Sequence, residues 1–124
     1  MPQKLTRLKK RTDFLRISAQ KCSFVNQGFI LQADINPLAK ESLGNKPAPR
    51  VGFTVSKKVG KAVIRNLVKR RRRVLADNLI RSKKYYGIDY VVIGRRGALD
   101  LPFSVMIEDF KKSLRFVSKN IKNE

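Results

Sequence analysis

The residue types that point most clearly to a function are lysine and arginine, which are concentrated between Lys57 and Val74. Plotted at about 100° per residue, the period of an α-helix, this stretch separates into two arcs. One arc carries the polar set Arg65, Asn66, Lys69, Arg70, Arg72 and Arg73. Like charges three and four residues apart destabilise a helix, and a face that served solubility alone would mix signs. The pattern therefore favours binding of a polyanion over a merely solvated surface.

The opposite arc of the same stretch is apolar and can dock on a core. It carries Ile64, Leu67, Val68, Val74 and Leu75, with Leu79 at its edge. Arg71 alone projects from the middle of this arc. A helix with one apolar and one cationic face packs on the protein and presents its cations outward.

Groups that perform acid–base or nucleophilic chemistry are scarce. The chain has no histidine, one cysteine and nine acidic residues, so it lacks Ser/His and Cys/His pairs and ordinary zinc sites. The best acidic pair, Glu108 and Asp109, is adjacent on a predicted helix, where neighbouring side chains diverge by about 100°. We therefore predict no catalytic residue and no metal ligand in this chain, and Cys22 is expected to be a small buried hydrophobe in a reduced compartment.

The overall charge points to the same kind of partner. Lys and Arg number 29 against 9 Asp and Glu, which gives a formal charge of +20 in 124 residues. Such an excess suits RNA, DNA or an anionic membrane surface. No apolar run approaches the ~20 residues that span a bilayer, and no secretory signal is apparent. We expect a cytoplasmic protein, and membrane binding is disfavoured because the apolar arc is needed for the core.

The elements that must position these residues follow from hydrophobic periodicity. We expect a short helix N-capped by Thr12, a basic helix reaching about Arg81, and a last helix opened by Pro102 and Ser104. The predicted strands are 23–26, 29–35, 50–56 and 88–94, the last central because it is apolar on both sides. The last helix should face the core with Phe103, Met106 or Ile107, Phe110, Leu114, Val117 and Ile121.

These elements predict an α+β protein with a single sheet of about four strands packed by helices, in the order α-β-β-β-α-β-α. Its length suits one domain over 1–124. Residues 1–11 are expected to be a flexible basic arm, and 36–50 is a loop by composition.

The spacing Gly60-x-Ala62-x-x-Arg65-Asn66-x-x-Lys69-Arg70-x-x-Arg73 is more specific than the charge. Entered from Val51–Gly52–Phe53–Thr54–Val55–Ser56–Lys57–Lys58–Val59, it resembles the signature of the bacterial ribonuclease P protein subunit. The resemblance extends weakly over most of the chain. It has departures: the family usually has Arg at position 67, Leu at 71 and an acid at 74, and often an aromatic at 18 and at 32. Here these positions hold Leu67, Arg71, Val74, Ser18 and Gln32.

The resemblance implies a fold feature and a function that periodicity does not show. The strand–helix–strand unit from Val51 to Gly94 would cross over in the rare left-handed sense. The protein would bind the catalytic RNA subunit of ribonuclease P and the 5′ leader of precursor tRNA, with no obligate protein partner. Mg²⁺ held by that RNA would serve the hydrolysis that removes the leader. Leader binding should be weakened by the loss of aromatic residues at positions 18 and 32.

Residues are assigned to these two tasks as follows. The RNA-binding helix and the residues before it would contribute Lys57, Lys58, Lys61, Arg65, Asn66, Lys69, Arg70, Arg72 and Arg73. The leader cleft would involve Phe14, Ile30, Gln32, Arg95 and Arg96. For Phe14 the simpler interpretation is a core aromatic, which needs no further explanation. The alternative function is a ribosomal or other structured-RNA-binding protein with no part in cleavage.

Overall fold

The computed structural model describes residues 6–20, 22–40, 46–55 and 59–122, apart from the side chains of 6, 40, 63, 66, 68–73, 83 and 122. The helices are α1 (Arg11–Ala19), α2 (Lys61–Arg81) and α3 (Phe103–Lys122). The strands are β1 (Thr6–Arg7), β2 (Ser23–Val25), β3 (Phe29–Ile35), β4 (Arg50–Val55) and β5 (Ile88–Gly94). Short 3-10 helices lie in the connections at Pro37–Lys40, Lys83–Tyr85 and Arg96–Leu99.

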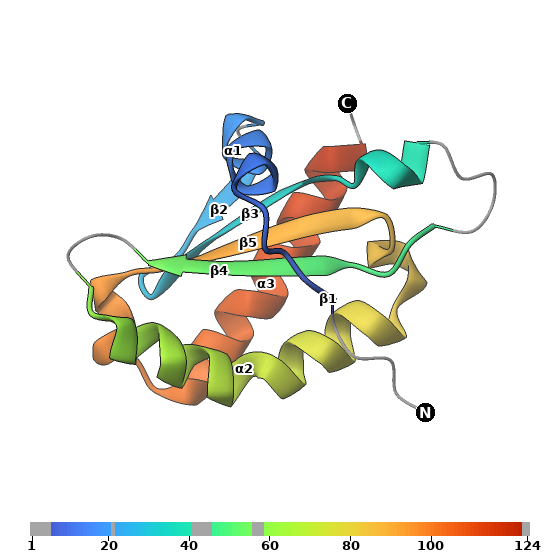
Figure 1. Ribbon diagram of the computed structural model, residues 1–124. Helices are drawn as coiled ribbons and strands as arrows, with labels where there is room; N and C mark the ends of the chain where they lie inside the picture. The colour runs from blue at the N-terminus through green and yellow to red at the C-terminus, as the bar shows by residue number, and fades with distance from the viewer. Residues whose placement is uncertain (1–5, 21, 41–45, 56–58, 123–124) are drawn as a thin grey trace.

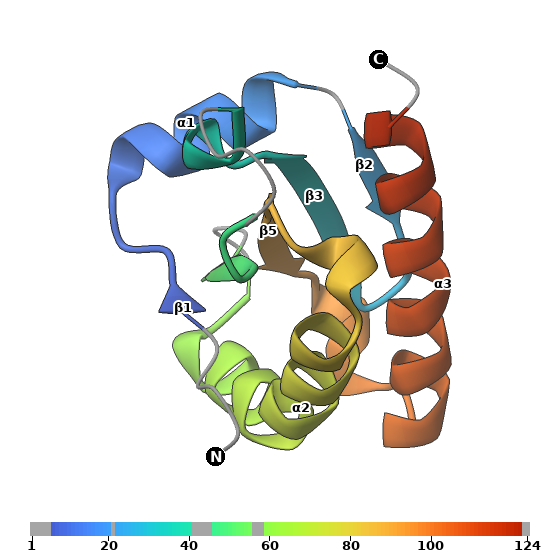
Figure 2. The same ribbon diagram turned by 90° about the vertical axis from the view of Figure 1, so that its right-hand side faces the viewer.

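One mixed sheet organises the chain, in the strand order β1-β4-β5-β3-β2. β5 pairs in parallel with β4 and antiparallel with β3, which confirms its predicted central place. α1 lies on one face of the sheet, and α2 and α3 cover the other (Figures 1 and 2). The predicted α+β class and element order are confirmed. The left-handed crossover from β4 through α2 to β5 stays a prediction.

The main core lies between the sheet and the two longer helices. Alternate residues of the strands point into it, as with Leu31 and Tyr90, which are both fully buried. α3 closes the core with the buried stripe Met106, Phe110, Leu114, Val117 and Ile121. Cys22 is buried in the same cluster, as expected.

Phe103 is the exception to the predicted core-facing stripe of α3, because it is 37% exposed. It is the first residue of the helix, where the chain has only just left the preceding connection. Ile107 is half buried whereas Met106 is buried, which settles the alternative that the spacing left open.

Tyr90 carries a polar atom into this core. Its hydroxyl is buried and has no hydrogen-bond partner among the described residues. Burial also raises the pKa of the Tyr90 phenol well above its ordinary value, because the charged form would be desolvated.

The N-terminal segment differs from the expected flexible arm over 1–11. Thr6 and Arg7 pair in parallel with the start of β4, and the Leu8 amide donates to the Val51 carbonyl at 2.9 Å. Leu8 is buried beside Ile17. The backbone pairing and this apolar contact hold residues 6–8 against the sheet, while 1–5 lie outside the described residues.

The beginning of α1 also differs from the sequence-based expectation. Lys10 occupies the N-cap position and makes no side-chain capping bond, whereas Thr12 lies inside the helix. An apolar contact explains this earlier start, since Phe14 and Ile17 of α1 pack with Leu8 and Val91. Packing of a helix on its neighbours commonly outweighs a single capping preference.

Candidate RNA-binding surfaces

The predicted apolar side of α2 faces the core where the structure describes its side chains. Leu67, Leu75 and Leu79 are buried, and Ile64 and Val74 are half buried. No acidic residue occupies its first turn, so the positive end of the helix dipole stays available to an anion.

The predicted cations of this helix can be placed only in part. Lys61 and Arg65 are exposed. The backbone of α2 carries Asn66, Lys69, Arg70, Arg72 and Arg73, and their side chains lie outside the described residues. Lys57 and Lys58 lie outside them altogether. Leu67 is 6% exposed and belongs to the core, so it offers no contact to RNA.

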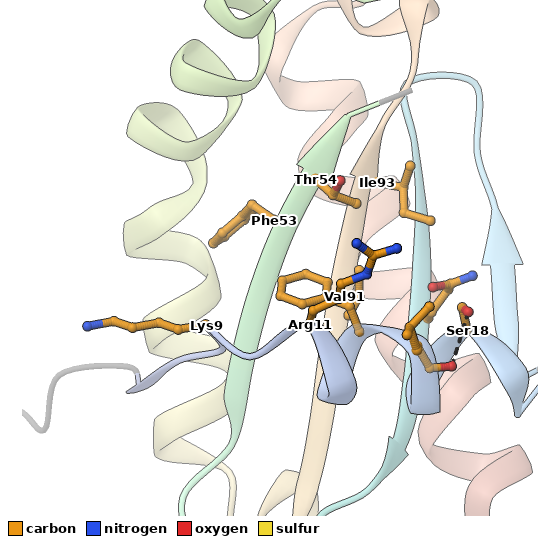
Figure 3. A pocket seen from close by; sticks show the side chains of 10 residues that line it. Lys9, Arg11, Ser18, Phe53, Thr54, Val91 and Ile93 are labelled. Carbon is orange, nitrogen blue, oxygen red and sulfur yellow. Dashed lines mark hydrogen bonds between the residues drawn. The ribbon is translucent and has the colours of Figure 1, made fainter. Parts of the chain in front are cut away.

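The opposite face of the sheet carries a pocket, which we call the outer pocket, with a volume of about 470 Å³. It is lined by Lys9, Arg11, Phe14, Leu15, Ser18, Gln32, Phe53, Thr54, Val91 and Ile93. α1 forms one wall and strands β3, β4 and β5 form the floor. Figure 3 shows Arg11 and Ser18 on α1, and Thr54, Val91 and Ile93 on the strands.

Phe14 and Gln32, two of the predicted cleft residues, meet in the outer pocket. The Phe14 ring lies directly above Gly52, where an added Cβ would stand 2.5 Å from the ring. Phe14 is half buried: it packs against Leu8 and Ile17 and also lines the pocket. Its predicted contact with leader RNA stays a prediction.

The other predicted cleft residues lie around the pocket rather than in its lining. Ile30 is half buried and pairs with Ile93, which does line the pocket. Arg95 and Arg96 are exposed and follow the end of β5. The Arg95 guanidinium donates to the Asn26 carbonyl at 2.7 Å, which fixes it beside the turn between β2 and β3.

Several lining residues were not identified as candidates from the sequence. They are Lys9, Arg11, Leu15, Phe53, Thr54, Val91 and Ile93. The alternation of β4 and β5 could have placed Thr54, Val91 and Ile93 on one face. The contribution of Lys9 and Arg11 could not be read, because it depends on where the N-terminal segment and α1 lie on the sheet.

The pocket combines an apolar floor with cations and small polar groups at its margin. Flat apolar surface and an aromatic ring suit the faces of nucleic-acid bases, and the cations suit the phosphates between them. Within the described residues, no group of three or more acidic, His or Cys side chains could hold a metal ion. None of the described helices is long and apolar enough to cross a membrane.

Comparisons with known proteins all point one way. A family model described as Ribonuclease P matches residues 1–118. The ribonuclease P protein component of Paramagnetospirillum magneticum is 43% identical over 117 residues, covering 94% of this chain and 86% of the relative. That of Bacillus velezensis is 37% identical over 115 residues, covering 91% and 86%.

Solved structures agree with these sequence relatives. The RNase P protein of Staphylococcus aureus superposes with a TM-score of 0.66 at 32% identity, covering 90% of this chain and 94% of that chain. The RNase P protein of Thermotoga maritima gives a TM-score of 0.61 at 28% identity, covering 91% and 96%.

Proposed function

The chain belongs to the bacterial ribonuclease P protein family and is a component of that ribonucleoprotein endonuclease, and we propose that its two surfaces bind two different RNAs. The helix α2 binds the RNA subunit of ribonuclease P. The outer pocket binds the single-stranded 5′ leader of precursor tRNA. The protein thereby raises substrate affinity while the RNA subunit performs the cleavage, in the cytoplasm.

The observation that carries this proposal is the placement of the two surfaces on opposite faces of one sheet. α2 covers the core face, and α1 lies on the other face (Figure 2). The outer pocket is lined by residues of α1 and of the strands beneath it. One small protein can therefore contact a large folded RNA with one side and hold a flexible strand with the other. A binder of one structured RNA has no need of the second surface.

The division of labour follows from the side chains that are present. The chain has no histidine. Glu108 is exposed on α3 and its neighbour Asp109 is half buried, so these two carboxylates do not point toward a common site. Mg²⁺ bound by the RNA subunit would supply the activation of water and the stabilisation of charge in phosphodiester hydrolysis. The residues of this chain contribute binding: cations on phosphates, and Phe14 with the apolar pocket floor on bases.

Cleavage of a precursor tRNA at low Mg²⁺ tests the proposal. The protein alone, the cognate RNA subunit alone and the two together would be compared. Cleavage at the mature 5′ end by the mixture, and none by the protein alone, is expected. If the protein left the activity of the RNA unchanged, a structured-RNA binder outside cleavage would be the better description.

A further inference from the structure

Five charged side chains meet between α1 and the outer face of the sheet, apart from the residues assigned so far. We call Asp13, Arg16, Asp34, Arg50 and Asp89 the charge cluster. Arg16 of α1 reaches two strands at once: Nη1 lies 2.7 Å from Asp34 Oδ2, and Nη2 lies 2.6 Å from Asp89 Oδ2. Nη1 also donates to the Ile35 carbonyl at 2.8 Å.

Asp89 is the centre of the cluster and is fully buried. Arg50 donates to both of its oxygens, from Nε at 2.9 Å and from Nη2 at 2.6 Å. This hydrogen bonding raises the pKa of the Arg50 guanidinium against the opposing effect of burial. Asp13 lies at the margin, 3.4 Å from Arg16 and 3.9 Å from Arg50. One buried carboxylate therefore joins β4 and β5 to α1.

The strand register places this cluster directly beside the outer pocket. Asp34 and Arg50 are both Cα partners of Asp89. Two residues further along the same strands stand Gln32, Val91 and Gly52, again mutual partners. Two residues of strand span about 7 Å, so the cluster forms the side-chain row next to the pocket floor. α1 connects the two rows, since it sends Arg16 into the cluster while Phe14 lies over Gly52.

Within the part of the chain that the structure describes, the other contact of α1 with the sheet is apolar and small. Its apolar contact is a small cluster of Leu8, Ile17 and Val91, with Phe14 and Ile93 half buried against it. The core on the other face is far larger. Apolar packing is non-directional, whereas hydrogen bonds from a planar guanidinium to two carboxylates fix both distance and orientation. The direction in which α1 crosses the sheet is therefore set mainly by the charge cluster.

The use of acidic residues supports the same conclusion. The chain has nine acids, and the cluster holds three of them against two arginines, one net negative charge in a chain of +20. Arg16 and Arg50 are consequently neutralised rather than available to phosphate. The charge cluster is therefore poorly suited to bind phosphate, and the remaining interpretation is that it holds α1 on the sheet.

We propose that Asp89, together with Arg16 and Arg50, is the positioning element of the leader site: it holds α1 over the sheet at the spacing that the outer pocket needs to accept a strand of RNA. This inference rests on the proposed function of the pocket. Asp89 acts through α1 and touches no substrate, so its effect should appear only where a leader occupies the pocket.

The test uses the reconstituted holoenzyme with two precursor tRNAs, one with a long leader and one with a single-nucleotide leader. Asp89→Asn removes the central charge, and Arg16→Lys keeps the charge but cannot bridge two carboxylates in the same way. Asp34→Asn leaves the Arg50–Asp89 pair intact and keeps the test available if Asp89→Asn does not fold. Glu108→Gln on α3 is the control for removing one exposed acid. Circular dichroism checks the fold of each variant, and affinity for the RNA subunit is measured separately.

The cluster variants are expected to weaken long-leader binding by roughly ten- to a hundredfold, the range of one lost stacking contact. Affinity for the short-leader substrate and for the RNA subunit should stay at the wild-type value, as should every affinity of Glu108→Gln. An equal loss on both substrates, or no loss on either, would overturn the positioning role. A wild-type enzyme that bound the two substrates equally would instead overturn the leader assignment, and this inference with it.

Discussion

Gly52→Ala perturbs the outer pocket at a single point, the contact between the floor of the sheet and α1. A Cβ at this position would lie 2.5 and 2.7 Å from two atoms of the Phe14 ring and 3.1 Å from Leu8 Cβ. Ordinary van der Waals contact begins at 3.4 Å, so the ring must move outward or α1 must lift from the sheet.

The cost can be estimated from this overlap. Inserting a methyl group into a packed site costs about 1–3 kcal/mol, and the gain from replacing a strand glycine by alanine, about 0.5–1 kcal/mol, opposes it only in part. Gly52→Ala should therefore lower the free energy of unfolding by about 1–2 kcal/mol. Displacement of Phe14 should also weaken binding of long-leader substrate.

Urea unfolding of a double-mutant cycle isolates the contact. Phe14→Ala removes the ring, so Gly52→Ala should cost nothing in that background, giving a coupling energy of about 1–2 kcal/mol. Gly60→Ala is the matched control, because an added Cβ there meets no atom within 4 Å, and its effect should be additive with Phe14→Ala. Additive effects of Gly52→Ala and Phe14→Ala would refute the placement of the ring over Gly52.

Three further outcomes are expected. Tyr90→Phe should raise the free energy of unfolding by about 1 kcal/mol, since it removes an unpaired buried hydroxyl. The folded pKa of Tyr90 is raised, whereas the phenol of the unfolded chain ionises near pH ~10. The free energy of unfolding of wild type should therefore be independent of this ionisation below pH ~10 and fall above it. The loss relative to the variant should reach about 1.4 kcal/mol per pH unit, as urea unfolding at pH 9–11 would check. Leu67→Ala should cost about 2–5 kcal/mol through a cavity in the core, and an unchanged urea midpoint would place Leu67 outside it. Arg65→Ala and Lys69→Ala should weaken RNA-subunit binding and each flatten its salt dependence by about one unit of slope, whereas a wild-type slope would count against α2 as the binding face.

Much of the fold could be predicted because its long elements repeat one pattern over many residues. In α2 the apolar arc, and in β5 the apolar residues on both sides, indicate burial at several positions. A single exception therefore does not hide the pattern. The predictions that were wrong concern residues at the ends of helices. Phe103 fits the spacing of the α3 stripe, but burial at the first turn of a helix depends on what lies beyond it.

The outer pocket and the charge cluster were harder to predict from the sequence, because each combines residues of α1, β3, β4 and β5. Arg16 and Asp89 are 73 residues apart, and their contact depends on strand register, which no local pattern specifies. A weak signal existed: Asp34 and Asp89 are the only charged residues inside two predicted strands that are otherwise mainly apolar. A charge in a buried strand requires a partner, but it does not say which one.

The most direct test of the two-surface account is site-specific crosslinking in the holoenzyme bound to precursor tRNA. Cys22, the only cysteine, is buried, so a photoreactive group can be attached to one introduced thiol at a time. Ser18→Cys labels the outer pocket, Arg65→Cys labels α2, and Lys119→Cys on the exposed side of α3 is the control. We expect crosslinks from position 18 to leader nucleotides and from position 65 to the RNA subunit. Crosslinks from position 65 to the leader, or from position 18 to the RNA subunit alone, would contradict it.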